Sequence, residues 1–213
     1  MKLLQKDLKY NNNIYFFMEA EIDKTSEKII QATLVILQEN GFDKATTKKI
    51  AAEAGVNELT IFRKFKNKKN LVDATKEYYL QILIDKLNEI FEFDEDESID
   101  VFLKISFFGI LSLEDSDFSI LKVAMEEVRN DEEDEPLISK ITDLILNKLE
   151  EFFKLQIDKG VIKEINTRSI SVMCYSSLFQ SVILWKIYNK SLGFETNDYI
   201  DDLLNIFLEG IMI

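Results

Sequence analysis

The stretch TTKKIAAEAGVNELTIFRKF, residues 46–65, decides the fold of the N-terminal third of this chain. Thr47 is placed to cap a helix over Lys48–Ala54, because its hydroxyl can accept a hydrogen bond from a free N–H group of the first turn. Gly55 can adopt the positive φ angle that a sharp turn requires. Asn57 can then cap a second short helix. Two helices joined by so short a turn form the helix-turn-helix arrangement.

The apolar residues of this stretch favour close packing between the two predicted helices. Ala51 is small at the point where the second helix, Glu58–Phe65, must cross the first. The branched side chain of Ile61 can fill the space beneath the crossing. An ordinary helical hairpin would explain this packing, but it would not explain a polar outward face on the second helix. That face and the residues after it carry Asn57, Glu58, Thr60, Lys64, Lys66, Lys68 and Lys69.

Charge is distributed unevenly along the chain, whose formal net charge is −13 at pH 7. Residues 23–79 carry 11 Lys/Arg and 8 Asp/Glu, whereas residues 80–213 carry 12 Lys/Arg and 28 Asp/Glu. A basic module joined to a large acidic body is typical of a protein with a polyanionic partner. A lysine-rich face that is merely solvated would have the same composition, so charge alone leaves both interpretations open.

Composition restricts the fold and the chemistry of the 213 residues. Six glycines and one proline are too few for the turns of a many-stranded sandwich or barrel, so we expect an all-helical protein. The absence of histidine excludes serine–histidine and cysteine–histidine nucleophiles. A single cysteine, Cys174, excludes an internal disulfide and the usual zinc sites, and we interpret it as a small buried hydrophobic residue. The sequence contains no run of 18 apolar residues, so it does not predict a membrane-spanning helix.

Helical periodicity extends through most of the chain. Apolar residues from Ile29 to Leu37 lie on one face of a helix that begins at Lys24 and stops at Asn40-Gly41. A long amphipathic helix is expected from Lys68 to about residue 91. The later predicted helices run from a cap at Ser98 to Leu113, from Ser116 or Asp117 to Arg129, from Pro136 to Lys159, over 167–189 and over 196–210.

The chain contains Gly41-Phe42, Thr47-x-x-x-Ala51 and Ala54-Gly55-Val56-x-x-x-Thr60-Ile61-Phe62-Arg63-x-Phe65-x-Asn67-Lys68-x-x-Leu71. With these motifs, residues 24–79 resemble the DNA-binding domain of the TetR family of bacterial regulators. The remainder is similar to that family only in length and helical layout. The resemblance implies an N-terminal tail over 1–22, a three-helix helix-turn-helix domain over 23–67 and a larger helical ligand-binding and dimerisation domain over 68–213. A translation start at Met18 instead of Met1 stays open.

Proteins of this family are dimeric and are usually repressors that release DNA when a small molecule binds the helical body. The resemblance therefore implies a cytoplasmic homodimer that binds a palindromic double-stranded operator. It implies an apolar or aromatic small-molecule effector and no catalytic residue, metal, cofactor or membrane partner. Whether the chain represses or activates transcription stays open.

Carried over to this chain, the resemblance places the second helix of the motif in the major groove. Glu58 can accept from a cytosine amino group, and Leu59 or the Thr60 methyl group can contact a thymine methyl group. Hydroxyls and ammonium groups nearby would contact phosphates. The predicted DNA-binding residues are Thr46, Thr47, Lys48, Asn57, Glu58, Leu59, Thr60, Phe62, Lys64 and Lys68.

Three of these positions depart from the habit of the family. Phe62 stands where a tyrosine often donates its hydroxyl to a phosphate, and Lys64 stands where histidine is frequent. Leu59 replaces a residue that is often small. We still expect DNA binding, but these departures weaken any inference about the operator sequence.

The last two predicted helices carry apolar residues over more of their circumference than one buried face needs. The resemblance favours a twofold dimer interface on these helices, with a purely monomeric core as the alternative. Aromatic residues and methionines on the middle helices are expected to surround an effector cavity, although ordinary core packing would show the same spacing. The predicted ligand-binding residues are Phe102, Ile105, Phe108, Met125, Phe152, Met173, Tyr175 and Phe179.

Two further functions were compared with this interpretation. An enzyme would need converging carboxylates, but adjacent acids such as Glu150 and Glu151 do not point to one side of a helix. A helical dimer that binds a small molecule or a protein, and keeps the helix-turn-helix only as a scaffold, is the stronger alternative. Phe62 slightly favours it, because phenylalanine cannot donate to a phosphate.

Overall fold

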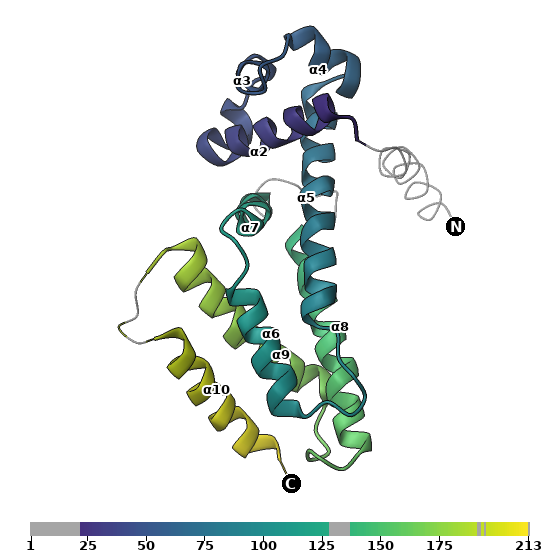
Figure 1. The fold of residues 1–213 in the computed structure, drawn as a ribbon, viewed down its shortest axis with the longest axis vertical. Helices are drawn as coiled ribbons and strands as arrows, with labels where there is room; N and C mark the ends of the chain where they lie inside the picture. The colour runs from purple at the N-terminus through teal and green to yellow at the C-terminus, as the bar shows by residue number, and fades with distance from the viewer. Residues whose placement is uncertain (1–21, 128–136, 191–192, 194, 213) are drawn as a thin grey trace, which may run out of the picture. The chain divides into compact units, whose positions relative to one another are not determined.

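The computed structural model describes residues 22–127, 137–190, 193 and 195–212, without the side chains of 124–127. These residues are helical apart from their connections and one isolated bridge between Ile162 and Met212. They divide into two compact units, unit 1 up to Tyr79 and unit 2 from Leu80. Figure 1 shows the helices of each unit. The prediction of an all-α fold is confirmed, whereas the expected tail lies almost wholly outside the described residues.

Unit 1 is built around the predicted helical crossing. It contains α2 (Lys24–Lys44), α3 (Thr47–Glu53), α4 (Glu58–Phe65) and the first part of α5 (Lys68–Ile90). Helix α3 packs on both α2 and α4. Ile61 of α4 is 0% exposed and Ala51 of α3 is also buried, while Phe65 and Leu71 extend the same core. The crossing therefore follows from the small and branched residues that predict it.

The ends of the short helices agree with the predicted pattern except for one shift. Asn57 caps α4 through a hydrogen bond of 2.9 Å, and Gly55 adopts a φ angle of 65°. The prediction that Thr47 caps α3 is wrong. The Thr46 hydroxyl accepts from the Lys49 N–H at 3.3 Å, and α3 begins at Thr47. This shift leaves the hydroxyl of Thr47 available for a side-chain partner.

Helix α2 is fixed at its beginning and interrupted close to its predicted end. The Asp23 side chain accepts from the N–H groups of Thr25 and Ser26 and so caps the helix. Gly41 adopts a φ angle of 69° and a ψ angle of 171°, which breaks the helical geometry before a last turn to Lys44.

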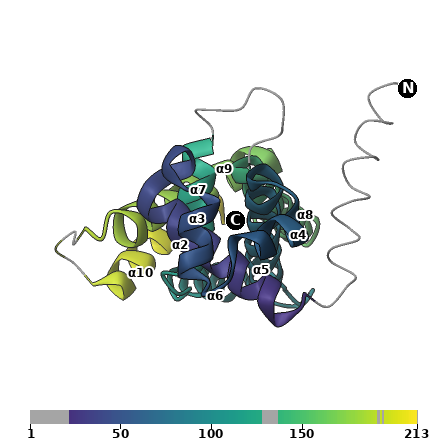
Figure 2. The same ribbon diagram turned by 90° about the horizontal axis from the view of Figure 1, so that it is seen from above.

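Unit 2 is a bundle of longer helices. Besides the rest of α5 it contains α6 (Ile99–Leu111), α7 (Asp117–Glu127), α8 (Leu137–Asp158), α9 (Thr167–Val182) and α10 (Thr196–Ile211). Helix α8 packs along α9, and α7 packs on α8. Helix α10 lies against α6 at one side of this unit (Figure 2). The helix predicted over 167–189 consists of α9 and a following π turn, Ile183–Ile187.

The other predicted ends in unit 2 are largely confirmed. Helix α6 follows Ser98, although the Ser98 side chain makes no capping hydrogen bond. Helix α8 ends shortly before Gly160, which adopts a φ angle of 69°. The predicted helix end at Arg129 and start at Pro136 lie outside the described residues.

The core of unit 2 is rich in phenylalanine. The rings of Phe102 on α6 and Phe152 on α8 are stacked with centroids 3.9 Å apart. Phe91 and Phe93 meet the Phe102 ring edge-on, and Phe153 meets the Phe152 ring in the same way. The Phe102–Phe152 pair therefore holds α6 against α8 by aromatic packing.

Cys174 on α9 belongs to the same buried interior, as predicted. Burial raises the pKa of its thiol to about 12, because the thiolate would lose its hydration. The thiol is therefore protonated at physiological pH and is not a reactive nucleophile.

By length and composition, one helix within the described residues could cross a membrane, namely Thr167–Ile187. The sequence did not predict such a helix, because polar residues interrupt every apolar run in this segment. Buried core helices pass the same test. In this chain the helix packs on α8 with Ile170, Leu178 and Val182 buried.

The crossing in unit 1 gives the first testable prediction. Ile61→Ala should lower the free energy of unfolding by about 2–5 kcal/mol, because it leaves a cavity beneath α4. Leu59→Ala on the same helix is the matched control, because Leu59 is 74% exposed and its truncation should change stability by less than about 0.5 kcal/mol. Urea unfolding followed by circular dichroism would measure both. Equal losses from the two variants would contradict this packing.

Candidate functional site

The outward face of α4 is the first candidate site. Asn57 and Leu59 at the start of the helix are exposed, and Glu58 and Thr60 are half-buried. Phe62, one turn further on, is also exposed. Because Ile61 and Phe65 face the core, α4 presents its first turn to solvent. A helix that enters a DNA groove must offer its N-terminal residues in this way.

Two of the predicted DNA-binding residues bond to each other. The Thr47 hydroxyl of α3 donates to Glu58 Oε1 at the start of α4, over 2.6 Å. The sequence predicts a phosphate contact for Thr47 and a base contact for Glu58, but not this bond. It fixes the direction of the Glu58 carboxylate, whose second oxygen is a further acceptor.

Lys64 near the end of α4 also has an internal partner. Its ammonium group lies 2.6 Å from Asp23 Oδ2, and Asp23 is the residue that caps α2. The Lys64 hydrogen bond, followed by those from Ser26, holds the pKa of the Asp23 carboxyl well below its usual range. Asp23 is therefore ionised at any physiological pH and competes with external anions for Lys64. The sequence pattern does not predict this pair, because 41 residues separate Asp23 from Lys64.

The remaining predicted phosphate contacts surround the same face. Lys68, in the first turn of α5, donates to the carbonyl of Phe42 at 2.6 Å and lies 4.4 Å from the centroid of its ring. Lys48 on α3 is exposed. Thr46 is also exposed, with its hydroxyl engaged in capping. Lys48 is thus the predicted phosphate ligand that needs the least rearrangement.

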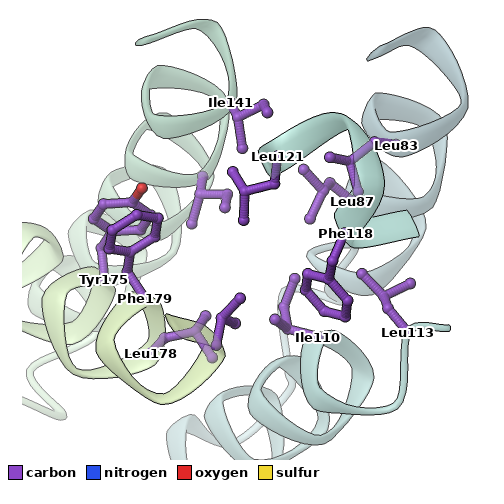
Figure 3. Close-up of a pocket in the computed structure, with 12 residues that line it drawn as sticks. Leu83, Leu87, Ile110, Leu113, Phe118, Leu121, Ile141, Tyr175, Leu178 and Phe179 are labelled. Atoms are coloured by element: carbon purple, nitrogen blue, oxygen red, sulfur yellow. The ribbon is translucent and has the colours of Figure 1, made fainter. Parts of the chain in front are cut away.

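A pocket within unit 2 is the second candidate site. It is lined by Leu83 and Leu87 (α5), Ile110 (α6), Leu113 (between α6 and α7), Phe118 and Leu121 (α7), Ile141 and Ile145 (α8), and Tyr175, Leu178, Phe179 and Val182 (α9). In Figure 3, Tyr175 and Phe179 lie together on α9 across the pocket from Leu83 and Leu87. The cavity measures about 40 Å³, which is room for a few water molecules. A larger ligand would have to spread the lining helices.

Among the lining residues that the structure describes, only Tyr175 has a polar side-chain atom, and that atom is already hydrogen-bonded. Its hydroxyl and the Thr142 hydroxyl of α8 lie 2.8 Å apart in a hydrogen bond. Burial raises the pKa of Tyr175 above its usual value, although the Thr142 bond partly opposes this. The pocket therefore offers an apolar surface.

Of the predicted ligand-binding residues whose side chains the structure describes, Tyr175 and Phe179 line this pocket and the others do not. The predicted placement is corrected for Phe102 and Phe152, which stack on each other in the core. It is also corrected for Ile105 and Met173, which are 54% and 63% exposed.

Phe108 is half-buried and is not part of the lining. The side chain of Met125 lies outside the described residues. The leucines of the lining are not predicted by the sequence pattern. Aliphatic residues at helical spacing look alike whether they fill a core or border a cavity.

Exposed apolar residues gather on the last two helices. Val172 and Met173 on α9 and Ile206 on α10 are exposed, with Ile206 at 74%. Leu178 and Leu204 on the same two helices are instead buried within unit 2. Exposed apolar side chains on these two helices are suited to an interface between two chains.

Known proteins resemble this chain most strongly in the helix-turn-helix of unit 1. Residues 29–75 match the family model described as bacterial regulatory proteins, tetR family. The uncharacterized HTH-type transcriptional regulator YvkB of Bacillus subtilis is 48% identical over 50 residues, which cover 24% of this chain and 26% of that protein. The match with that relative therefore spans about a quarter of its length. The fatty acid metabolism regulator protein of Bacillus subtilis is 25% identical over 188 residues, which cover 86% and 94% of the two chains.

Solved structures extend the likeness to the fold of both units. A TetR family transcriptional regulator from Pseudomonas syringae has a TM-score of 0.68 at 19% identity and covers 91% of this chain and 100% of its own. The fatty acid degradation regulator FadR from Bacillus halodurans has a TM-score of 0.64 at 23% identity and covers 89% and 97%. The family model matches the helix-turn-helix, and these relatives share the architecture along nearly all of the chain. The helix-turn-helix segment therefore matches the TetR family of bacterial regulatory proteins, and the chain is similar to such regulators along nearly all of its length.

Proposed function

We propose that the chain is a cytoplasmic transcriptional repressor that binds a palindromic operator as a homodimer and releases it when a small, largely apolar molecule enters unit 2. The observation that carries this proposal is the exposed first turn of α4, held outward by the burial of Ile61 and Phe65. A helix-turn-helix kept only as a scaffold would not need Leu59 in solvent. The family consists of transcriptional regulators, which are not enzymes.

In the proposed complex α4 reads base edges in the major groove. Asn57, Leu59 and Thr60 contact bases directly, and Glu58 accepts from a cytosine amino group. Thr47 acts through Glu58, because its hydroxyl holds that carboxylate in place. The polar contacts to the DNA backbone come from Thr46, Lys48, Lys64 and Lys68, and Phe62 contacts the backbone without a hydrogen bond.

Charge favours this division of labour between the units. The net positive residues 23–79 attract the duplex, whereas residues 80–213 carry 28 acids against 12 basic residues and repel it. We infer that unit 2 serves dimerisation and sensing. An isologous interface through Met173 and Ile206 would present two copies of α4 to successive major grooves on one side of the DNA.

The effector class follows from the pocket and from one relative. The lining is apolar, and the relative aligned over most of the chain is a fatty acid metabolism regulator protein. An alkyl chain would suit such a lining. Because the cavity is only about 40 Å³, the effector must bind a more open form of unit 2. Helix α5 contributes Leu83 and Leu87 to the pocket and Lys68 to unit 1, so it can transmit that opening.

Selection of bound duplexes from a random pool tests the proposed function. The full chain should recover a palindrome whose half-sites are one helical turn apart, and its affinity should fall steeply with salt. Lys48→Ala should weaken all recovered sequences alike and reduce the salt slope by about 0.9, the contribution of one phosphate. Recovery of no palindrome, or binding that does not depend on salt, would contradict the proposal.

The bond between Thr47 and Glu58 gives a prediction about sequence preference. Thr47→Val should reduce the preference for cytosine at one operator position per half-site by about tenfold, because Glu58 loses its orienting donor. Thr47→Ser keeps the hydroxyl and should keep the preference. Binding of both variants to operators with C·G and T·A at each position would measure the effect. If valine and serine weakened all operators equally, Thr47 would be a phosphate ligand instead.

The pair between Asp23 and Lys64 predicts a gain of affinity. Asp23→Asn keeps a good N-cap for α2 but removes the charge that holds Lys64. Lys64 can then join a phosphate at no electrostatic cost, so operator affinity should rise several-fold and the salt slope should steepen by up to about 0.9. Asp43→Asn, at an exposed acid of unit 1, is the control for the loss of one negative charge. An equal gain from both variants would show a general charge effect rather than competition for Lys64.

A further inference from the structure

Lys186 places a positive charge beside the apolar pocket of unit 2. Its ammonium group donates to the backbone carbonyl of Leu113 at 3.2 Å and lies 5.7 Å from the centroid of the Phe118 ring. Leu113 and Phe118 both line the pocket. The charge therefore lies directly behind part of the lining, although Lys186 is not a lining residue itself.

The π turn that follows α9 explains how Lys186 reaches the edge of the pocket. Val182, which ends α9, lines the pocket, and Lys186 lies within the π turn that follows. A π turn holds more residues than an α-helical turn, so it changes the direction of the side chains after it. Lys186 consequently reaches the segment between α6 and α7, and π turns often occur at binding sites.

The surroundings of Lys186 leave its charge incompletely compensated. The acid next to Phe118 in sequence, Asp117, is bonded to Lys86 at 2.6 Å and accepts from the Glu114 N–H. Where the structure describes side chains, Lys186 itself takes part in no ion pair, and its hydrogen-bond acceptor is a neutral carbonyl. A half-buried ammonium group in this setting would gain from an anion, because charge-assisted bonds are stronger than bonds to neutral groups.

We propose that the effector is a monoanionic amphiphile with a single alkyl chain, of the fatty-acid carboxylate type, and that Lys186 binds its anionic head. This inference rests on the proposed function, because it names the chemical class of the effector. The alkyl chain occupies the apolar lining, and the head takes the place of the Leu113 carbonyl as the acceptor for Lys186. Tyr175 is not assigned this role, because its hydroxyl carries no charge and is paired with Thr142.

The test compares two ligands that have the same alkyl chain and differ in their head group, which is an anionic carboxylate in one and a neutral alcohol in the other. Trp185, the single tryptophan of the chain, directly precedes Lys186, so its fluorescence can report binding. The full chain is titrated with decanoate and with decan-1-ol, which have the same number of carbon atoms. We expect decanoate to bind at least about tenfold more tightly, because only its head forms a charge-assisted bond.

Variants then assign the preference to one side chain. Lys186→Met keeps an unbranched side chain without charge and should weaken decanoate binding about tenfold while leaving decan-1-ol unchanged. Lys186→Arg should retain the preference. Lys154→Met removes an exposed lysine of α8 and is the control for net charge, so it should behave as the unmodified chain does. Circular dichroism and thermal melting check that each variant is folded.

The outcomes separate this inference from the function on which it rests. Equal affinities of the unmodified chain for the two ligands would overturn the role of Lys186, whatever the variants do. A preference for decanoate that survives in Lys186→Met would also overturn it. In either case saturable binding of decan-1-ol would still support the apolar pocket. Saturable binding of neither ligand would contradict the proposed effector class and this inference with it.

Discussion

The burial of Ile61 beneath the crossing of α3 and α4 is the contact on which the DNA-binding unit depends. Because Ala51 is small, the two helices approach closely, and Ile61 is completely removed from solvent. Its position also fixes the rotation of α4 about its own axis. A residue two positions away, such as Leu59, must then lie on the outer face, whereas Lys64, three positions on, lies nearer the packed side and is half-buried. One apolar contact thus determines which polar groups can meet a partner.

Local features of unit 1 could be predicted because each arises from a few neighbouring residues. A turn glycine, a capping asparagine and a branched residue at the crossing have strong conformational consequences wherever they occur. The contacts between distant residues could not be predicted in this way. Asp23 meets Lys64, and Thr47 meets Glu58, only after the helices have packed. The cap of α3 was misplaced by one residue because two threonines are adjacent.

The pocket of unit 2 shows the opposite case. Large aromatic residues were expected around a cavity, but Phe102 and Phe152 bury their faces on each other and leave no surface for a ligand. The lining comes mostly from leucines and isoleucines of five helices. Their spacing along the sequence is the same as that of the other core residues. A cavity depends instead on where the side chains of several helices leave a gap in the packing. Such a site becomes visible only when all of the helices have been placed.

The internal partners on the reading face of α4 have a consequence for the search along a genome. On DNA of the wrong sequence, Glu58 can keep the Thr47 hydroxyl and Lys64 can keep Asp23. Each of these four side chains then keeps a hydrogen-bond partner. The non-specific complex therefore has little free-energy cost from unsatisfied polar groups while the protein slides along the DNA. Only a matching site adds a base partner for the second oxygen of Glu58 while the Thr47 bond is kept, and the phosphates there can draw Lys64 away from Asp23. Rapid scanning and firm arrest would thus arise from the same two pairs.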